Sequence, residues 1–378
     1  MAQQSVDVAI VGGGLLGWSA AYRLAKAGQR VLVADSLEEG TATNAGAGII
    51  APGTSVRISP AGLLIGASAV QYYPQLLAEL ASDGETNTGY ATVGSLFVAR
   101  NEEEAARLPD VQELMLERRA GGMGNIGEVS LLTGAEAKAL FPALSDLPAA
   151  IHASGSARVN GRLMRDSLRN GAERHGARIA IGRASVLTDG NRATGIEVAG
   201  ERYAAGQVLI SGGAWSAAMG EKLGVNLPVH PQRGQIMHLE MRGSDTSAWP
   251  IIVGFHSHYI LTFPTSRVVC GATREHESGF DPRLTAGGIE EVLREAFIVA
   301  EGLRSAALIE FRVGLRPFSK DEQPILGAVP GWDNVFVSTG HGPSGLQLGP
   351  VSSAAVVDVM LGNQPRFDIA AFSPSRFS

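Results

Sequence analysis

The sequence predicts an α/β protein in which a domain built on a parallel sheet is joined to a second domain built on an antiparallel sheet. Three observations support this prediction. Residues 6–35 read as strand, glycine turn, helix and strand. The apolar runs 208–210 and 334–338 each lead from a strand into a glycine turn and then a helix. Between them, residues 227–275 alternate in polarity as antiparallel strands do.

The N-terminal unit has the spacing of a dinucleotide-binding βαβ motif. Gly12 permits a tight turn, Gly14 has no side chain to obstruct a pyrophosphate, and Gly17 lets the helix lie close to the strand. Asp35 ends the second strand, where an acid hydrogen-bonds a ribose hydroxyl and repels the extra phosphate of NADP. These residues predict a Rossmann-like domain that holds the pyrophosphate at a helix N-terminus.

The other elements are predicted from the period of the apolar residues. Helices are expected over 63–80, over the charged stretch 101–145 apart from a loop at 120–124, and over 160–176, 289–303 and 349–361. Strands are expected at 6–11, 30–35, 93–98, 179–181, 185–187, 194–198, 208–210, 235–239, 259–263, 267–273, 309–314 and 334–338.

Length and composition limit the classes of protein. A chain of 378 residues is long enough for two domains. A formal net charge of −6, with scattered basic residues, argues against nucleic acid as a partner. The only cysteine, Cys270, excludes an intrachain disulfide and a cysteine-based metal site, and it fits a reducing cytoplasm. No apolar run is long enough for a membrane span, so we expect a soluble cytoplasmic protein without a leader segment.

Four segments give the chain a resemblance to the D-amino-acid-oxidase (DAO) superfamily of flavoenzymes, and within it to glycine oxidase. They are 8–17, 211–216 together with 228–235, 313–317 and 339–345, and they occur in the order found in that family. The resemblance covers nearly the whole chain and implies FAD as the cofactor. It also implies a discontinuous FAD-binding domain and a substrate-binding domain. We expect the former at 1–85, 150–222 and 320–378, and the latter at 86–149 and 223–319.

The resemblance implies a set of cofactor-binding positions in the glycine turns and the small-residue segments. They are Gly12, Gly14, Leu15, Gly17, Asp35, Ser36, Asn44, Ala45, Gly46, Gly48, Val186, Gly212, Gly213, Trp215, Gly314, Gly342, Pro343, Ser344, Gly345 and Leu346. Because relatives that tether FAD use a cysteine in the C-terminal third, and Cys270 lies on an apolar strand, we predict noncovalent FAD.

A substrate clamp is also implied by the resemblance. Arg316 matches an arginine that pairs through its planar fork with the substrate carboxylate, and Tyr259 matches a tyrosine that hydrogen-bonds the same group. A structural ion pair for Arg316 and a core position for Tyr259 are the alternatives.

Two departures from glycine oxidase bear on the substrate. Pro343 stands where that family has an arginine, which argues against simple glycine as the preferred substrate. Arg274 stands where the family has an apolar residue. By strand alternation its cation either faces the pocket and accepts a second carboxylate, or faces solvent and pairs with Glu275 or Glu277.

The resulting prediction is an FAD-dependent enzyme that oxidises the C–N bond of a glycine-type or N-substituted glycine, such as an N-carboxymethyl amino acid. The imine then hydrolyses, and O2 reoxidises the flavin and yields H2O2. One alternative is a D-amino acid or hydroxy acid dehydrogenase with another electron acceptor, and a second is a noncatalytic flavin-binding subunit. Both a monomer and a homo-oligomer are compatible with the sequence.

Three histidines are candidates for a general base: His256, His258 and His341. His256 and His258 precede Tyr259, where a gating or structural role is favoured over catalysis. Their two-residue spacing lacks a third ligand, so no metal site is predicted.

Overall fold

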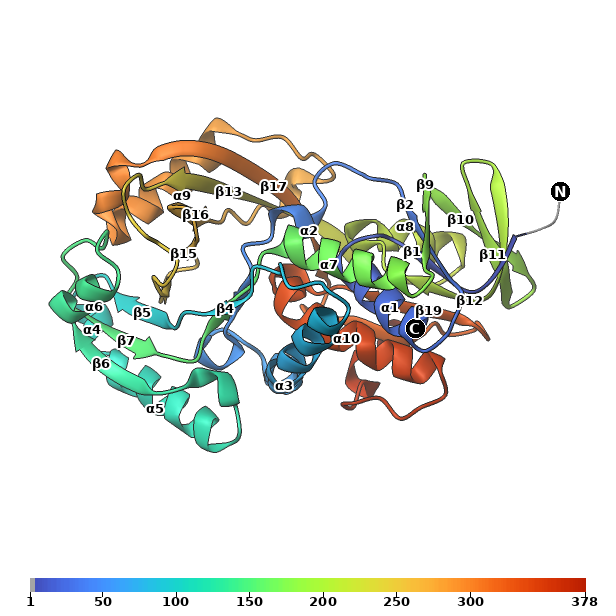
Figure 1. Ribbon diagram of the computed structural model, residues 1–378, viewed down its shortest axis with the longest axis horizontal. Coiled ribbons are helices and arrows are strands. Elements are labelled where there is room, and N and C mark those ends of the chain that lie inside the picture. The colour runs from blue at the N-terminus through green and yellow to red at the C-terminus, as the bar shows by residue number, and fades with distance from the viewer. Residues whose placement is uncertain (1–3) are drawn as a thin grey trace.

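The computed structural model describes residues 4–378 and places two eight-stranded sheets toward opposite ends of an elongated molecule (Figure 1). One sheet is mainly parallel and the other mainly antiparallel, which confirms the predicted fold class. Residues 1–3, which begin the predicted FAD-binding segment 1–85, lie outside the described part of the chain.

The first sheet has a parallel centre in the order β9-β2-β1-β12-β19. Strand β18 extends it antiparallel to β19, and β10 and β11 form an antiparallel ribbon on the first half of β12. The bounds are β1 Gln4–Val11, β2 Val31–Asp35, β9 Arg178–Ile181, β10 Ala184–Asp189, β11 Arg192–Val198, β12 Glu201–Ile210, β18 Ile325–Ala328 and β19 Val335–Thr339.

One face of this sheet is covered by four helices whose apolar side chains form a common core with it. They are α1 Leu15–Lys26, α3 Pro60–Ser82, α7 Gly161–Arg174 and α10 Gly345–Met360. The short helices α2 Ala42–Ala45 and α8 Ser216–Lys222 accompany the glycine-rich turns. Apolar residues on both faces of the central strands are buried, as expected for a parallel sheet covered on both sides.

Helix α10 begins four residues earlier than the sequence predicts, at Gly345 rather than Gly349. Pro350 lies inside it and has no N–H to donate to the carbonyl of Leu346 four residues before. The hydroxyl of Tyr73 from α3 donates a hydrogen bond to that carbonyl. A tertiary contact therefore satisfies the acceptor that the proline leaves free.

The second sheet has the order β17-β13-β16-β15-β14-β5-β7-β6, and only its β5–β14 pair is parallel. Its bounds are β5 Ser95–Ala99, β6 Val129–Thr133, β7 Ala149–Ala153, β13 Val229–Glu240, β14 Ile251–Gly254, β15 Tyr259–Phe263, β16 Arg267–Gly271 and β17 Ala307–Ser319. The helices α4 Glu102–Ala105, α5 Leu108–Ala120, α6 Gly134–Leu140 and α9 Ala286–Val299 accompany it, and a small sheet of β3 Ile49–Ile50, β4 Ala91–Thr92 and β8 Ala157–Arg158 joins the two regions.

The prediction of helix throughout 101–145 outside one loop is wrong at β6, because Val129–Thr133 pairs with β7 at the end of the sheet. Thr133 then caps α6, and its side chain and that of Glu136 form a capping box. The predicted domain boundary between residues 149 and 150 falls inside β7, which belongs to the second sheet. The division of the chain into domains remains a proposal.

Within residues 4–378, the structure has no helix that combines the length and the apolar content needed to cross a bilayer.

Candidate active site

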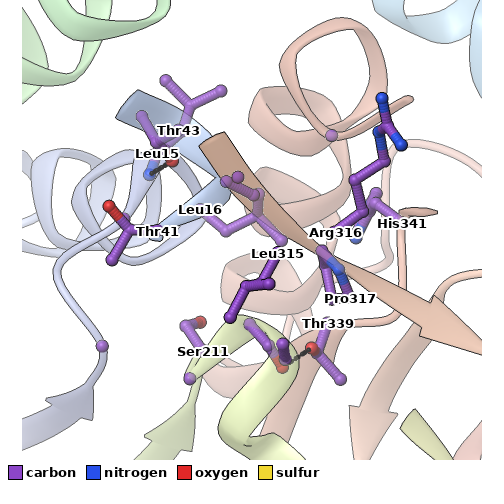
Figure 2. Close-up of a pocket in the computed structure, with 18 of the residues that line it drawn as sticks. Leu15, Leu16, Thr41, Thr43, Ser211, Leu315, Arg316, Pro317, Thr339 and His341 are labelled. Atoms are coloured by element: carbon purple, nitrogen blue, oxygen red, sulfur yellow. Dashed lines mark hydrogen bonds between the residues drawn. The ribbon is translucent and has the colours of Figure 1, made fainter. Parts of the chain in front are cut away.

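A cavity with about 1560 Å³ of empty space, part of it open to solvent, runs between the two sheets. Its first part lies at the carboxyl ends of β1, β2, β12 and β19, where open α/β sheets bind ligands. Its second part is lined by residues of β13, β15 and β17. In Figure 2, Leu15 and Thr43 lie on one side of the view and Arg316 and Pro317 of β17 on the other, with Leu16 and Leu315 between them. The cavity is therefore long enough to join a nucleotide site to a substrate site.

The glycine turn after β1 is shaped by close backbone packing. Gly12 has a φ of +113°, and a Cβ there would lie 2.3 Å from the carbonyl oxygen of Ser211. A Cβ on Gly17 would lie 1.9 Å from the carbonyl oxygen of Gly12. Gly14 is different, since its Cβ would meet only the Thr43 hydroxyl, at 3.4 Å. The space beside Gly14 thus belongs to the cavity, and the turn fits a dinucleotide pyrophosphate.

The N-terminus of α1 is open to an anion. Gly14 is the N-cap, no side chain caps the helix, and the first turn contains no acidic residue. The amide of Leu15 donates to the Thr43 hydroxyl at 3.0 Å. The positive end of the helix dipole therefore faces the cavity without a competing carboxylate of α1.

Replacing Gly14 with alanine should leave the protein folded and weaken FAD binding at least about tenfold. The φ of −74° suits alanine, and the new methyl group would occupy space next to the helix N-terminus. The measurement is the dissociation constant of FAD by fluorescence, with unfolding followed by circular dichroism. Gly287→Ala is the matched control, because a Cβ there meets nothing within 4 Å. Unchanged FAD affinity in Gly14→Ala would place the pyrophosphate elsewhere.

Asp35 lies at the end of β2 and lines the cavity beside the glycine turn. A Cβ on Gly13 would come within 2.5 Å of its Oδ2 atom, so the carboxylate is held directly against this turn. That position suits a hydrogen bond to a ribose hydroxyl of a dinucleotide bound at α1.

The turn before α10 lines another part of the cavity. Gly342, Pro343, Gly345 and Leu346 line the cavity, and Gly342 has a φ of +51°. No side chain caps α10 and its first turn has no acid. This second helix N-terminus would stabilise negative charge on a reduced flavin ring.

His341 lines the cavity next to this turn and is almost completely buried. Burial lowers its pKa to about 4, so its imidazole is neutral near pH 7. Neither ring nitrogen has a hydrogen-bond partner of acceptable geometry among residues 4–378. The neutral ring therefore lies beside this turn with both nitrogens shielded from solvent.

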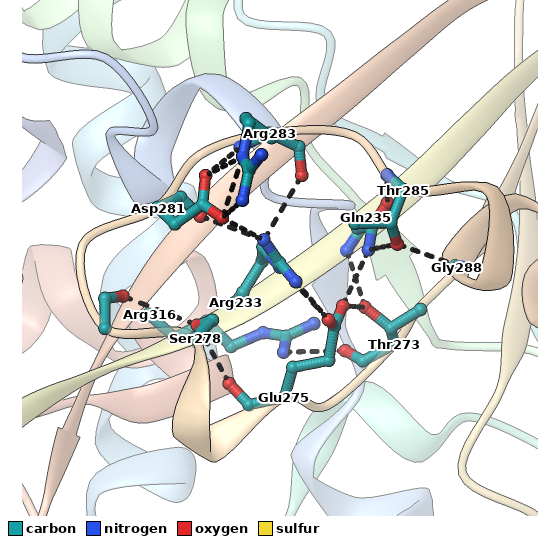
Figure 3. Close-up of polar contacts among 11 residues, drawn as sticks. Arg233, Gln235, Thr273, Glu275, Ser278, Asp281, Arg283, Thr285, Gly288 and Arg316 are labelled. Carbon is teal, nitrogen blue, oxygen red and sulfur yellow. Dashed lines mark hydrogen bonds and ion pairs between the residues drawn. The ribbon is translucent and has the colours of Figure 1, made fainter.

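Arg316 comes from β17 and lies directly opposite Gln232 of β13. Its Nη1 atom donates to Gln232 Oε1 at 2.9 Å and to the carbonyl of Thr273 at 3.0 Å, the latter drawn in Figure 3. The guanidinium lies flat over Gly234, where a Cβ would come within 2.3 Å of Nη2. These contacts fix the group at the wall of the cavity.

Tyr259 begins β15 and lies against the Arg316 guanidinium. Burial raises the pKa of the Tyr259 phenol, and the charges of Arg316 and Arg274 oppose that rise. The phenol therefore stays protonated at neutral pH, as a hydrogen-bond donor to a carboxylate must be.

Arg274 also lines the cavity, and its Nη1 atom donates to the carbonyl of Ser257 at 2.8 Å. The Arg274 side chain is exposed to solvent at the open part of the cavity, and partial desolvation, followed by the charge of Arg316, lowers its pKa. Glu275 forms its ion pair with Arg233 at 2.6 Å, not with Arg274 (Figure 3). Among residues 4–378 no ion pair joins Arg274 or Arg316 to a carboxylate. The cavity therefore presents two guanidinium groups to an anionic ligand.

Most of the predicted cofactor positions line the cavity, but four do not: Gly17, Asn44, Val186 and Ser344. Gly17 packs against the glycine turn. The Asn44 amide donates to the Thr41 hydroxyl at 2.8 Å and accepts a bond from Arg165. Val186 packs against an apolar core of the first sheet, and Ser344 is the N-cap residue of α10.

Sequence reasoning missed several residues that line the cavity beside predicted ones. They include Gly13, Glu38, Arg183, Met219, Gly234, Leu315, Pro317, Thr339 and Gln347. The sequence does carry a signal for two of them, because Gly13 follows a strand of the parallel sheet closely and Thr339 ends one. Residues such as Gly234 and Met219 come from the second sheet and the α8 region, and local sequence carries no sign of their approach.

His256 and His258 lie outside this cavity and line a small one behind Tyr259. His258 Nε2 is 3.1 Å from Glu291 Oε1, and burial lowers the pKa of His258 against the effect of nearby carboxylates. In the described part of the chain, no cluster of three His, Cys, Asp or Glu side chains could hold a metal ion.

Cys270 is buried in β16 and does not line the cavity. Burial raises the pKa of its thiol to about 12, which keeps it un-ionised at neutral pH. We therefore expect acid precipitation to release all of the yellow flavin into the supernatant, measured by absorbance. Flavin remaining with the pellet would contradict noncovalent binding.

Comparison with known proteins agrees with this geometry. The family described as FAD dependent oxidoreductase, DAO, matches residues 7–359. An uncharacterized oxidoreductase, YurR, of Bacillus subtilis is 40% identical over 367 residues, which cover 97% of this chain and 98% of that protein. The glycine oxidase of Pseudomonas putida is 29% identical over 379 residues, which cover 98% of each protein.

Solved structures show the same fold. The iminodiacetate oxidase of Chelativorans sp. BNC1 superposes with a TM-score of 0.93 at 40% identity, covering 97% of this chain and 98% of that one. The glycine oxidase of Geobacillus kaustophilus gives a TM-score of 0.86 at 27% identity, covering 99% of both chains. The predicted FAD cofactor is confirmed by the family. The chain belongs to the DAO family of FAD-dependent oxidoreductases and is an enzyme of the glycine oxidase-like type.

Proposed function

We propose that the protein oxidises the C–N bond of an N-substituted glycine that carries a second carboxylate, an N-carboxymethyl amino acid. The observation that carries the proposal is the pair Arg316 and Arg274, which line one cavity without an ion pair to any carboxylate among the described residues. The positive charge of Arg316 acts on Arg274, and a dianionic ligand would relieve that repulsion.

The two arginines have distinct roles in this proposal. Arg316 and Tyr259 bind the carboxylate of the glycine unit, with Nε and Nη2 of Arg316 available because Nη1 is occupied by Gln232 and Thr273. Arg274 binds the second carboxylate. The similarity to an iminodiacetate oxidase supports this choice, because iminodiacetate is a secondary amine with two carboxylates.

The chain's own residues orient and desolvate the amine. The two cationic side chains lower the pKa of the bound amine, which favours the neutral form that can be oxidised. FAD, when bound, supplies the acceptor for the hydride from Cα. Hydrolysis of the resulting imine gives a primary amino acid and glyoxylate, and we propose O2 as the electron acceptor, reduced to H2O2.

The first test is aerobic H2O2 release by the purified yellow protein with iminodiacetate, sarcosine, glycine and D-alanine, together with anaerobic bleaching of the flavin. We expect peroxide and the highest kcat/KM with iminodiacetate. Bleaching without peroxide would indicate that the electron acceptor is a molecule other than O2. Equal kcat/KM for iminodiacetate and sarcosine would contradict a second carboxylate site.

A further inference from the structure

We infer that Gln232 positions the Arg316 guanidinium for carboxylate binding, and that His276 holds the Gln232 amide in the required orientation. The inference rests on the proposed role of Arg316. It starts from a chain of side chains that leads from the cavity wall to the protein surface: Arg316, Gln232 and then His276.

The orientation of the Gln232 amide follows from hydrogen-bond chemistry. A guanidinium can only donate, so the oxygen of Gln232 must face Arg316 Nη1, at 2.9 Å. The amide nitrogen of Gln232 then lies 2.8 Å from His276 Nε2. Because an amide NH2 group can only donate, His276 Nε2 must accept and therefore carries no proton.

Gln232 is 2% exposed, so its amide has no access to bulk water as an alternative partner. The second acceptor for Arg316 Nη1 is the carbonyl of Thr273, which belongs to the network around Glu275 (Figure 3). With both Nη1 hydrogens occupied, the guanidinium can present Nε and Nη2 together as a fork for a carboxylate. Gln232 thereby selects the edge of Arg316 that meets the substrate.

His276 is at the surface, where it can exchange protons with solvent. Its ring lies edge-on to Phe318 of β17, with the ring centroids 4.9 Å apart, and 6.0 Å from the ring of His230 of β13. Glu275 and Glu277 are its chain neighbours, and Glu275 is engaged with Arg233. Among its ring contacts and chain neighbours, the titratable groups are His230, Glu275 and Glu277.

Protonation of His276 would place an N–H against the Gln232 NH2 group. The amide could then satisfy His276 only by turning its oxygen away from Arg316, which would leave two donor groups facing each other at the cavity wall. The N–H of protonated His276 and Nη1 of Arg316 would both need the amide oxygen of Gln232 as their acceptor. Carboxylate affinity should consequently fall as the pH is lowered.

The test uses the FAD-bound protein and acetate, a single carboxylate that engages Arg316 without requiring Arg274. Its dissociation constant is measured from the change in flavin absorbance between about pH 5.5 and 8.5. We expect about fivefold weaker binding at the acidic end, the size of effect for one lost hydrogen bond. His276→Gln keeps an acceptor that does not titrate, so it should bind acetate as the wild type does at high pH and lose the pH dependence.

His230→Gln is the matched control, because it removes the neighbouring imidazole without touching Gln232, and it should keep the wild-type pH dependence. Gln232→Leu should weaken acetate at every pH. Equal pH dependence in the wild type and His276→Gln, or unchanged acetate affinity in Gln232→Leu, would overturn the inference. Arg316→Lys separates the two proposals: if it binds acetate as tightly as the wild type, or if the wild type binds none, the Arg316 clamp itself fails.

Discussion

Replacing Arg316 with lysine should lower kcat/KM for every carboxylate-bearing amine by about 100-fold or more, because two charge-assisted hydrogen bonds of the fork are lost. Nη1 of Arg316 is committed to Gln232 and Thr273, and its other nitrogens remain for the substrate. One lysine ammonium cannot serve both sets of partners from the same position. The measurement is steady-state kinetics, with flavin content and the thermal midpoint showing that the variant is folded and loaded.

Arg312→Lys on the same strand is the control for this change. Arg312 pairs with Glu310 and does not line the cavity, so kcat/KM should stay within about twofold. A fall of similar size in both variants would mean that β17 is disturbed as a whole. An unchanged KM in Arg316→Lys would remove Arg316 from substrate binding.

Replacing Arg274 with methionine should lower kcat/KM for iminodiacetate by about 30-fold or more, and should leave sarcosine within about threefold of the wild type. Methionine keeps an unbranched apolar side chain at this position but lacks the guanidinium charge that would bind the second carboxylate. Sarcosine has one carboxylate, which Arg316 and Tyr259 bind in our proposal. The expected signature is thus a change in the ratio of kcat/KM for the two substrates.

Two further variants distinguish the charge of Arg274 from its structural contact. Its Nη1 atom also holds the carbonyl of Ser257, near Tyr259. Arg274→Gln keeps a donor for that carbonyl without the charge, and Arg274→Lys keeps the charge. If the charge binds substrate, lysine should restore part of the activity toward iminodiacetate and glutamine should not. Recovery with glutamine, or equal losses for both substrates, would assign Arg274 to holding the 255–257 segment.

Local sequence was enough to predict much of the glycine-rich part of the cavity. Gly12, Gly14 and Asp35 lie where their spacing indicates because one strand, one turn and one helix fix their relative positions. The strands and helices around these residues were predicted correctly for the same reason, because they too depend on residues that are close together in the sequence. Where a local pattern was ambiguous, as in Val129–Thr133, the partner strand decided the outcome.

The glycine turns and the fold class were predictable because they depend on short-range backbone geometry and on the local period of apolar residues, and the family resemblance carried by four segments implied FAD. The tertiary structure was needed to show that Arg274 lines the cavity, where it donates to the carbonyl of Ser257 while Glu275 pairs with Arg233. It also decided that Arg316 meets Gln232, which lies 84 positions away along the chain. That contact is created by the register of β13 against β17, and pairing between such distant strands depends on the packing of the whole sheet.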